Sequence, residues 1–231
     1  LAIWDKQQKT LSLARDRVGK KPLYFGRSNS NFCFSSELKA LKAIPDFQPK
    51  LDMQALGQYM RFNYIPAPYS IYEGIYKLEP GSFVTLTIEE LSSKTNLLEK
   101  CQKYWSALDV AQHHFTHPFT GSLEDAQSHL TDLLEDSTRL RMISDVPFGV
   151  LLSGGIDSSL VASMMQKQSS FPVNSFSIGF SNSDKDEAHL AKNIASYLGT
   201  SHNELYVSGQ DALNLVPDIG KYYDEPFADS S

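Results

Sequence analysis

The spacing of apolar and polar positions divides the chain into two parts with different periodicities. Up to about residue 88, short alternating segments are separated by polar turns, which is typical of antiparallel β-strands. From residue 123 onward, long helical segments alternate with short apolar runs, which is typical of βαβ units in a parallel sheet. The sequence therefore predicts a β-rich part followed by an α/β part.

The β-rich part is expected to begin with an antiparallel meander. Its four predicted strands cover residues 1–4, 10–15, 22–25 and 31–34. A short helix should follow from Ser36, and Asp52 can cap a second helix. Residues 82–88 alternate like another strand with one apolar face.

Residues 96–122 are polar and lack a sustained period, which indicates a connector between two domains. We therefore place one domain at residues 1–95 and the other at residues 123–231. The connector holds three neighbouring histidines: His113, His114 and His117. No Cys, Asp or Glu near them completes a metal-ligand set, so we interpret them as solvated side chains.

The α/β part is predicted to alternate helices with strands. Helices are expected over residues 123–142, 158–167, 187–198 and from Ser208 to about Tyr223, and strands over 148–152, 173–180 and 202–207. Such a unit should have three layers, with helices on both faces of a parallel sheet. We expect the strand over residues 148–152 to lie in the centre of that sheet.

Composition and charge narrow the class of protein. The 231 residues are 41% hydrophobic and 21% charged, with a net charge of −6, which fits a globular protein. No run of about 20 apolar residues could span a membrane, no leader peptide is recognisable, and the basic residues form no stripe for nucleic acid. We therefore expect a cytoplasmic protein that binds neither nucleic acid nor a membrane. Its two cysteines, Cys33 and Cys101, should be reduced.

The segment with the clearest chemistry is Ser-Gly-Gly-Ile-Asp-Ser-Ser, residues 153–159. It lies between an apolar strand and a helix, and such turns are where parallel sheets bind ligands. Gly154 and Gly155 lack a Cβ, so backbone N–H groups can approach a polyphosphate while the helix N-terminus adds positive potential. Three serine hydroxyls can donate further hydrogen bonds: Ser153, Ser158 and Ser159. The segment therefore predicts an ATP pyrophosphate-binding loop.

Asp157 is the acidic member of this loop. A carboxylate beside phosphate oxygens is repulsive unless a divalent cation bridges them, so we assign Asp157 to Mg²⁺. The loop lacks the Gly-Lys-Ser/Thr ending of kinase and GTPase phosphate loops. The alternative is a serine- and glycine-rich turn that binds no ligand, which the strand-loop-helix context disfavours.

This loop and its surroundings resemble the glutamine-hydrolysing asparagine synthetases, which belong to the pyrophosphate-loop ATPases with an adenine nucleotide alpha-hydrolase-like fold. The resemblance rests on residues 14–26, 34–41, 64–68, 75–81, 139–152, 176–180 and 223–231. It implies that residues 1–95 are the β-rich second half of an N-terminal-nucleophile glutaminase domain. Residues 96–122 would then be a connector, and residues 123–231 the start of the ATP-binding synthetase domain.

The resemblance implies ATP-dependent synthesis of asparagine. A glutaminase site would release ammonia, and a distant site would convert aspartate to β-aspartyl-AMP before ammonia displaces AMP. Adenylation gives the carboxylate a leaving group, and Mg²⁺ offsets charge as pyrophosphate departs. By position, Leu152 and Ile178 would contact the adenosine part of ATP through backbone groups, and Gly179 would allow close approach. The implied substrates are ATP, aspartate, and glutamine or ammonia, and the implied assembly is a homodimer.

Two departures from the family pattern concern this chain. The family's glutaminase nucleophile is a cysteine at the mature N-terminus, whereas the first residue here is Leu1, so no catalytic residue is assigned. The family's second pyrophosphate-binding segment would follow Ser231. We therefore expect a fragment that is inactive by itself.

Several interpretations stay open. A relative that amidates another carboxylate, such as a sugar acid or a β-lactam or peptide precursor, would use the same loop, and a catalytically dead nucleotide-binding remnant would retain it. Four basic residues are interpreted as fold-stabilising charges rather than a substrate clamp: Arg15, Arg17, Lys20 and Lys21. Asp224 and Glu225 either line the acceptor pocket or form a turn at a helix end.

Overall fold

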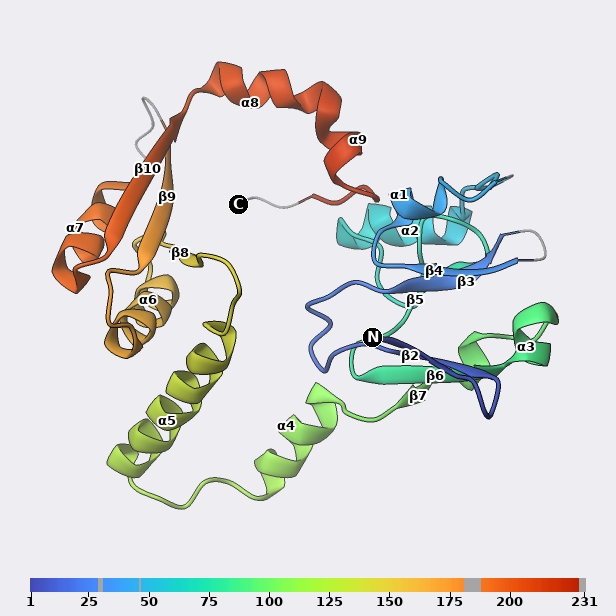
Figure 1. Ribbon diagram of the computed structural model, residues 1–231, viewed down its shortest axis with the longest axis horizontal. Helices are drawn as coiled ribbons and strands as arrows, with labels where there is room; N and C mark the ends of the chain where they lie inside the picture. Colours follow the sequence, from blue (N-terminus) through green and yellow to red (C-terminus); the bar gives the residue numbers. More distant parts are fainter. Residues whose placement is uncertain (29–30, 46, 181–187, 229–231) are drawn as a thin grey trace. The chain divides into compact units, whose positions relative to one another are not determined.

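The computed structural model describes residues 1–28, 31–45, 47–180 and 188–228. The chain forms two compact units (Figure 1). Unit 1 contains Leu1–Pro118 and the segment that begins at Asp218, and unit 2 contains Phe119–Pro217. None of the described helices is both long and apolar enough to cross a membrane.

Unit 1 contains two antiparallel sheets. The first has its strands in the order β1 (Ala2–Asp5), β2 (Thr10–Ala14), β6 (Ser82–Thr87) and β7 (Gln102–Lys103). The second has the order β4 (Asn31–Ser35), β3 (Tyr24–Ser28) and β5 (Ile75–Lys77). The predicted strands are present, but the prediction of a single meander is wrong. The strand β2 pairs with β6, whereas β3 pairs with β4 and β5.

Side-chain burial explains why the strands separate into two sheets. Leu13 of β2 lies opposite Val84 of β6, and both side chains are fully buried in one cluster with Phe25 of β3. Successive side chains of a strand point to opposite faces, so Tyr24 joins a second cluster that includes Leu38. The strand β3 therefore contributes to both apolar cores of unit 1.

Short helices complete unit 1. They are α1 (Leu38–Leu41), α2 (Met53–Phe62), α3 (Ile88–Ser92), η1 (Leu98–Lys100), α4 (Ala107–Thr116) and α9 (Ile219–Tyr222). The predicted cap at Asp52 is confirmed, because its carboxylate accepts hydrogen bonds from the N–H groups of Gln54 and Ala55. The connector, expected to be irregular, contains α4, whose first turn is capped by the Ser106 hydroxyl.

Unit 2 is built around a parallel sheet. Its strands have the order β10 (Ser201–Val207), β9 (Asn174–Phe180) and β8 (Gly149–Leu151). Its helices are α5 (Leu123–Arg141), α6 (Ile156–Gln168), α7 (Ala188–Leu198) and α8 (Gly209–Leu215), followed by the turn η2 (Val216–Asp218). The predicted mixed α/β fold with a parallel sheet is confirmed.

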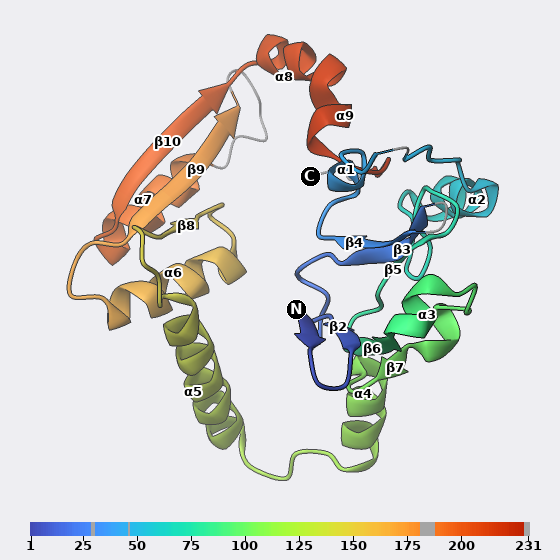
Figure 2. The ribbon, with the colours of Figure 1, turned by 45° about the vertical axis from the view of Figure 1, so that its right-hand side comes forward.

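Two details of the predicted sheet differ from the structure. The strand β8 lies at the edge of the described sheet, so the prediction that residues 148–152 form the central strand is wrong. The central strand is β9, because it pairs with both of its neighbours. The helices α6 and α7 contact each other over one face of the sheet (Figure 2). On β9, alternate side chains are exposed: Phe176, Ile178 and Phe180. The predicted helical layer on that second face is not seen among the described residues.

The core of unit 2 lies between the sheet and these two helices. Ala191 and Ala195 of α7 are fully buried, and their small side chains allow the helix to approach the strands closely. Gly199 follows the end of α7 with a left-handed φ of 73°, in agreement with the predicted helix end at residue 198. Ser208 and Asp211 form a capping box at the start of α8, where the sequence predicts that a helix begins.

Candidate functional site

The serine- and glycine-rich loop joins β8 to α6 at the carboxyl end of the parallel sheet. Leu152 continues the strand, because its N–H donates to the carbonyl of Phe176 at 2.8 Å. Gly154 then adopts a left-handed φ of 81°. A Cβ at this position would lie 2.8 Å from the Cβ of Leu190 on α7. Both backbone conformation and packing therefore require glycine at position 154.

Gly155 has a different environment. It is the N-cap of α6, with an ordinary φ of −76° and no capping side chain. A Cβ there would meet only the hydroxyl oxygen of Ser153, at 3.4 Å. Neither strain nor packing requires glycine here, so its effect is to leave the space before the first turn of α6 open. Helix N-termini present N–H groups and positive potential to anions, and open space lets an anion reach them.

The serine hydroxyls hold the loop together. The Ser158 hydroxyl lies 2.9 Å from that of Ser153 and also accepts a hydrogen bond from the Ser153 N–H at 3.2 Å. The Ser159 hydroxyl donates to the carbonyl of Gly155 at 2.6 Å. The predicted phosphate-binding hydroxyls are thus gathered around one turn. They can exchange these internal hydrogen bonds for bonds to phosphate oxygens.

Asp157 lies in the first turn of α6, and its side chain is exposed. No group of three or more His, Cys, Asp or Glu side chains in the described part of the chain could hold a metal ion. The described residues around the loop therefore do not form a metal site made of protein ligands alone. A lone exposed carboxylate is compatible with Mg²⁺, which keeps several waters and is commonly held by one or two carboxylates together with substrate phosphates.

The other predicted nucleotide contacts lie near this loop. Ile178 and Gly179 are at the carboxyl end of β9, the strand that pairs with β8. Ile178 is 57% exposed, so it is not a buried core residue of the strand. A Cβ at Gly179 would lie 2.5 Å from the ring of Tyr206 on β10. Packing against Tyr206 therefore gives a reason for glycine at 179 that the sequence alone did not suggest.

Arg15 and Asp16 organise the turn that follows β2. The Arg15 guanidinium donates to three backbone carbonyls: those of Leu78 at 2.7 Å, Gly19 at 2.9 Å and Lys21 at 3.0 Å. The Asp16 carboxylate accepts from the N–H groups of Lys20 and Lys21, which lowers its pKa. These contacts favour the fold-stabilising interpretation of Arg15 over a substrate clamp.

The two cysteines are poor candidates for a nucleophile. Cys33 on β4 is 6% exposed, and burial raises the pKa of its thiol. Burial and, to a smaller extent, the charge of Glu79 raise the pKa of Cys101 to about 11. A nucleophilic cysteine needs the opposite shift, because the thiolate is the reactive form. These environments disfavour either cysteine as a catalytic nucleophile.

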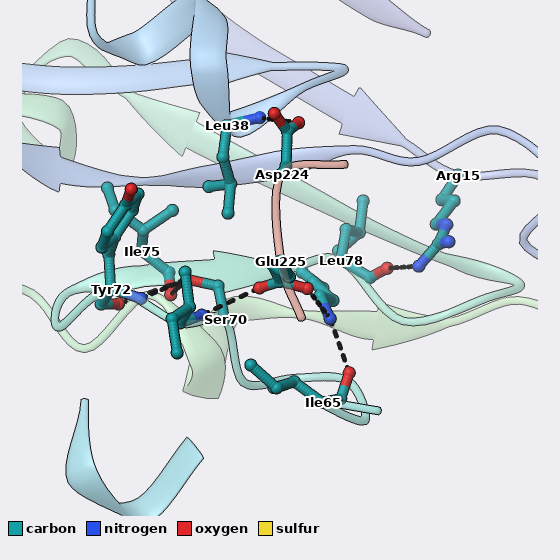
Figure 3. Close-up of polar contacts among 11 residues, drawn as sticks. Arg15, Leu38, Ile65, Ser70, Tyr72, Ile75, Leu78, Asp224 and Glu225 are labelled. Carbon is teal, nitrogen blue, oxygen red and sulfur yellow. Dashed lines mark hydrogen bonds and ion pairs between the residues drawn. The ribbon is translucent and has the colours of Figure 1, made fainter. Parts of the chain in front are cut away.

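Sequence reasoning missed a polar cluster around Asp224 and Glu225, just after α9. Asp224 contacts the start of α1, and Glu225 contacts Lys77 at the end of β5 and the N–H of Ile71 (Figure 3). All of these residues belong to unit 1. In the sequence, only the acidic pair before Pro226 pointed to this cluster. Its hydrogen-bond and ion-pair partners could not be identified, because all of unit 2 lies between them and the pair along the chain.

Comparison with known proteins covers both parts of the chain. Residues 1–105 match the family model of the glutamine amidotransferase domain, and residues 129–231 match that of asparagine synthase. A Methanocaldococcus jannaschii relative named for glutamine-hydrolysing asparagine synthetases is 32% identical over 99% of this chain and 42% of its own length. The Bacillus subtilis glutamine-hydrolysing asparagine synthetases 1 and 3 are 33% and 27% identical over 98% and 97% of this chain.

The chain spans less than half of the length of these relatives, covering 33% of the first Bacillus protein and 37% of the second. The matches nonetheless continue through both units, because each relative aligns with nearly the whole chain. The glutamine amidotransferase model matches the N-terminal part of the chain, and the asparagine synthase model matches the C-terminal part. Over both of its units the chain is therefore similar to glutamine-hydrolysing asparagine synthetases.

Proposed function

We propose that this chain is part of an enzyme that makes asparagine from aspartate, ATP and glutamine-derived ammonia. The observation that carries the proposal is the loop between β8 and α6, where an open glycine, three hydroxyls and one exposed carboxylate gather before a helix N-terminus. This is the arrangement that binding a polyphosphate needs. The similarity to asparagine synthetases supports ATP as the polyphosphate and the side chain of aspartate as the accepting carboxylate.

The finer assignments follow from the same proposal. Residues 123–231 would belong to a pyrophosphate-loop domain with an adenine nucleotide alpha-hydrolase-like fold, and residues 1–95 to an N-terminal-nucleophile glutaminase domain. Residues 96–122 would connect them. A cytoplasmic homodimer is part of this proposal, and sedimentation of the full-length protein would check its assembly. Nucleic acids and membranes have no place in the reaction.

In this proposal the loop residues bind the departing pyrophosphate. The backbone N–H groups at the start of α6 donate to its oxygens, and Gly155 leaves the space that the phosphates need. The hydroxyls of Ser153, Ser158 and Ser159 add hydrogen bonds, and Asp157 would hold Mg²⁺. When bound, Mg²⁺ would neutralise part of the charge that develops on the phosphates.

The adenosine part of ATP would lie beside the ends of β8 and β9. Leu152 is only 1% exposed as a whole residue, and its N–H already donates to the Phe176 carbonyl, so a contact with the nucleotide would be limited to a small part of its backbone. Ile178 has an exposed side chain and can contact the nucleotide with its backbone and its apolar surface. Gly179 next to it is buried and packs against Tyr206, so its proposed part in close approach of the nucleotide is not supported by an open surface there. The aspartate carboxylate must reach the α-phosphate in line with the pyrophosphate that leaves.

Asp157→Asn tests this function in the full-length protein. The substitution removes the charge and barely alters the volume, so we expect aspartate-dependent pyrophosphate release to fall about 100-fold or more. Glutaminase activity and the melting temperature should stay at wild-type values. The matched control is Asp132→Asn, which changes an exposed carboxylate on α5. Pyrophosphate release within about twofold of wild type in Asp157→Asn would mean that the loop is only a turn.

A further inference from the structure

Three histidines lie at the C-terminal end of α4. His113 and His114 belong to its last turn, and His117 is the C-cap residue. All three are exposed. Because they lie within five residues of one helix end, their mutual arrangement is set by this helix alone.

The rings of His113 and His117 are stacked. Residues four apart are neighbours on a helix surface. The two ring centroids are 4.6 Å apart, and the ring planes differ by 19°. The His114 ring is oriented differently, because it meets the His113 ring edge-on at 80° and 5.2 Å. The pair best placed to bind one ion together is therefore His113 with His117.

Hydrogen bonds determine which ring nitrogen of His117 is free. Its Nδ1 lies 3.1 Å from the carbonyl oxygen of His113, which can only accept. Nδ1 also lies 3.0 Å from the Thr116 hydroxyl, which itself donates to the His113 carbonyl at 2.9 Å. In the neutral imidazole Nδ1 therefore carries the proton, and Nε2 keeps its lone pair. Metal-binding histidines commonly have this arrangement, in which a backbone carbonyl fixes the tautomer and the ring orientation.

The ring of His113 is free to adjust. In the described part of the chain it makes ring contacts with His114 and His117 but no hydrogen bond. Its exposed side chain can therefore turn about its χ angles without breaking one, and bring a ring nitrogen toward an ion held by Nε2 of His117. One histidine of the pair is held in place and the other can complete the site.

We propose that His113 and His117 form a binding site for one divalent transition-metal ion of the Cu²⁺, Ni²⁺ and Zn²⁺ class. Imidazole nitrogens suit these ions, whereas Mg²⁺ prefers oxygen ligands, so the site differs in chemistry from the one proposed at Asp157. Two protein ligands leave the other coordination positions to water. A closed structural zinc site needs four protein ligands, and the described residues contain no cluster of even three.

A bound ion would stabilise the end of α4. The C-cap residue His117 has a non-helical backbone, with φ −128° and ψ 71°, and its N–H donates to the His113 carbonyl at 3.0 Å. An ion that joins the two side chains spans the same turn as this hydrogen bond, so it opposes fraying of the helix end. The His117 amide should therefore exchange its hydrogen more slowly when the ion is bound.

Cu²⁺ is the probe, because it is the divalent first-row ion that nitrogen sites bind most tightly. Calorimetric titration of the full-length protein without a histidine tag measures its affinity, and electron paramagnetic resonance detects nitrogen ligands. We expect His113→Asn and His117→Asn each to weaken this binding about tenfold or more. Exchange of the amide at position 117 should slow about twofold or more with Cu²⁺ in wild type, and in neither variant.

Two other histidines provide matched controls. His114→Asn removes the neighbouring ring that is not part of the pair. His129→Asn removes an exposed histidine of α5 whose ring contacts Phe119. Both variants should bind Cu²⁺ within about twofold of wild type. A large excess of Mg²⁺ should not displace Cu²⁺.

The substituted positions are exposed, so every variant should fold, and circular dichroism checks this. Wild-type affinity for Cu²⁺ in a His113→Asn/His117→Asn double variant overturns the site, as does a wild-type protein that binds no Cu²⁺. An equal loss in His114→Asn also overturns it, because the pairing of His113 with His117 predicts a difference. None of these outcomes bears on the proposed reaction, which does not use these histidines.

Discussion

The hydroxyl oxygens of Ser153 and Ser158 lie 2.9 Å apart, at the two sides of the turn between β8 and α6. The same Ser158 oxygen accepts a hydrogen bond from the Ser153 N–H and donates to the carbonyl of Gly155. The Ser158 side chain, in the first turn of α6, therefore fixes the position of Ser153 just after β8 through hydrogen bonds. The loop has its shape before any nucleotide binds, which lowers the entropic cost of binding.

The two loop glycines should respond differently to a methyl group. Gly154→Ala places a Cβ at a left-handed φ and against Leu190, so we expect a loss of about 1–3 kcal/mol in the free energy of unfolding. Gly155→Ala meets only the Ser153 hydroxyl and should leave stability within about 0.5 kcal/mol. Its methyl group would instead enter the space proposed for phosphates, so affinity for ATP should fall about tenfold or more.

Chemical denaturation and calorimetric titration with ATP in the full-length protein check these two expectations. Gly209→Ala is the matched control, because an added Cβ there has no neighbour within 4 Å. Equal ATP affinity in Gly155→Ala and wild type would contradict the role assigned to the open space.

Arg15 should contribute to stability through its three carbonyl partners. Lys has one ammonium group and cannot reproduce the planar fork that reaches Leu78, Gly19 and Lys21, so we expect Arg15→Lys to cost about 3 kcal/mol. Urea denaturation monitored by circular dichroism measures the loss. Arg17→Lys is the control, since Arg17 is exposed, and its stability should match that of wild type. A stable Arg15→Lys that has lost only activity would instead support a substrate clamp.

The cysteine thiols should resist alkylation in the folded chain. Their pKa values are raised, so the thiolate is the minor form until the pH approaches the pKa, which for Cys101 is about 11. At pH 8 about one Cys101 thiol in a thousand would be ionised. Mass spectrometry after iodoacetamide treatment should find Cys33 and Cys101 unmodified at pH 8 and both modified in guanidinium chloride.

The same environments predict no glutamine hydrolysis by this chain alone. The Cys33 and Cys101 thiols donate to the backbone carbonyls of Gly26 and Leu97, and burial opposes ionisation of both. Ammonia released from glutamine should not exceed that of a heat-inactivated control. Rapid labelling of either cysteine at pH 8, or release above the control, would show that a reactive thiol exists.

The local sequence determined most of the secondary structure. Caps and stops act within a few residues, so Asp52, the Ser208 and Asp211 box, and Gly199 could be identified from their neighbours alone. The nucleotide loop was predicted in the same way, because its glycines and hydroxyls are consecutive and their place between a strand and a helix is local information. Its assignment to ATP and Mg²⁺ remains a proposal.

Only the tertiary structure decided which strands pair and where the last segment lies. Alternation marks a strand but not its neighbour, so it could not show that β2 pairs with β6 or that β8 is an edge strand. The packing of Gly179 against Tyr206 likewise depends on the adjacent strand. The contacts of Glu225 with Lys77 join residues on either side of unit 2. Burial and the pairing of distant charges select such contacts, and neither leaves a periodic pattern in the sequence.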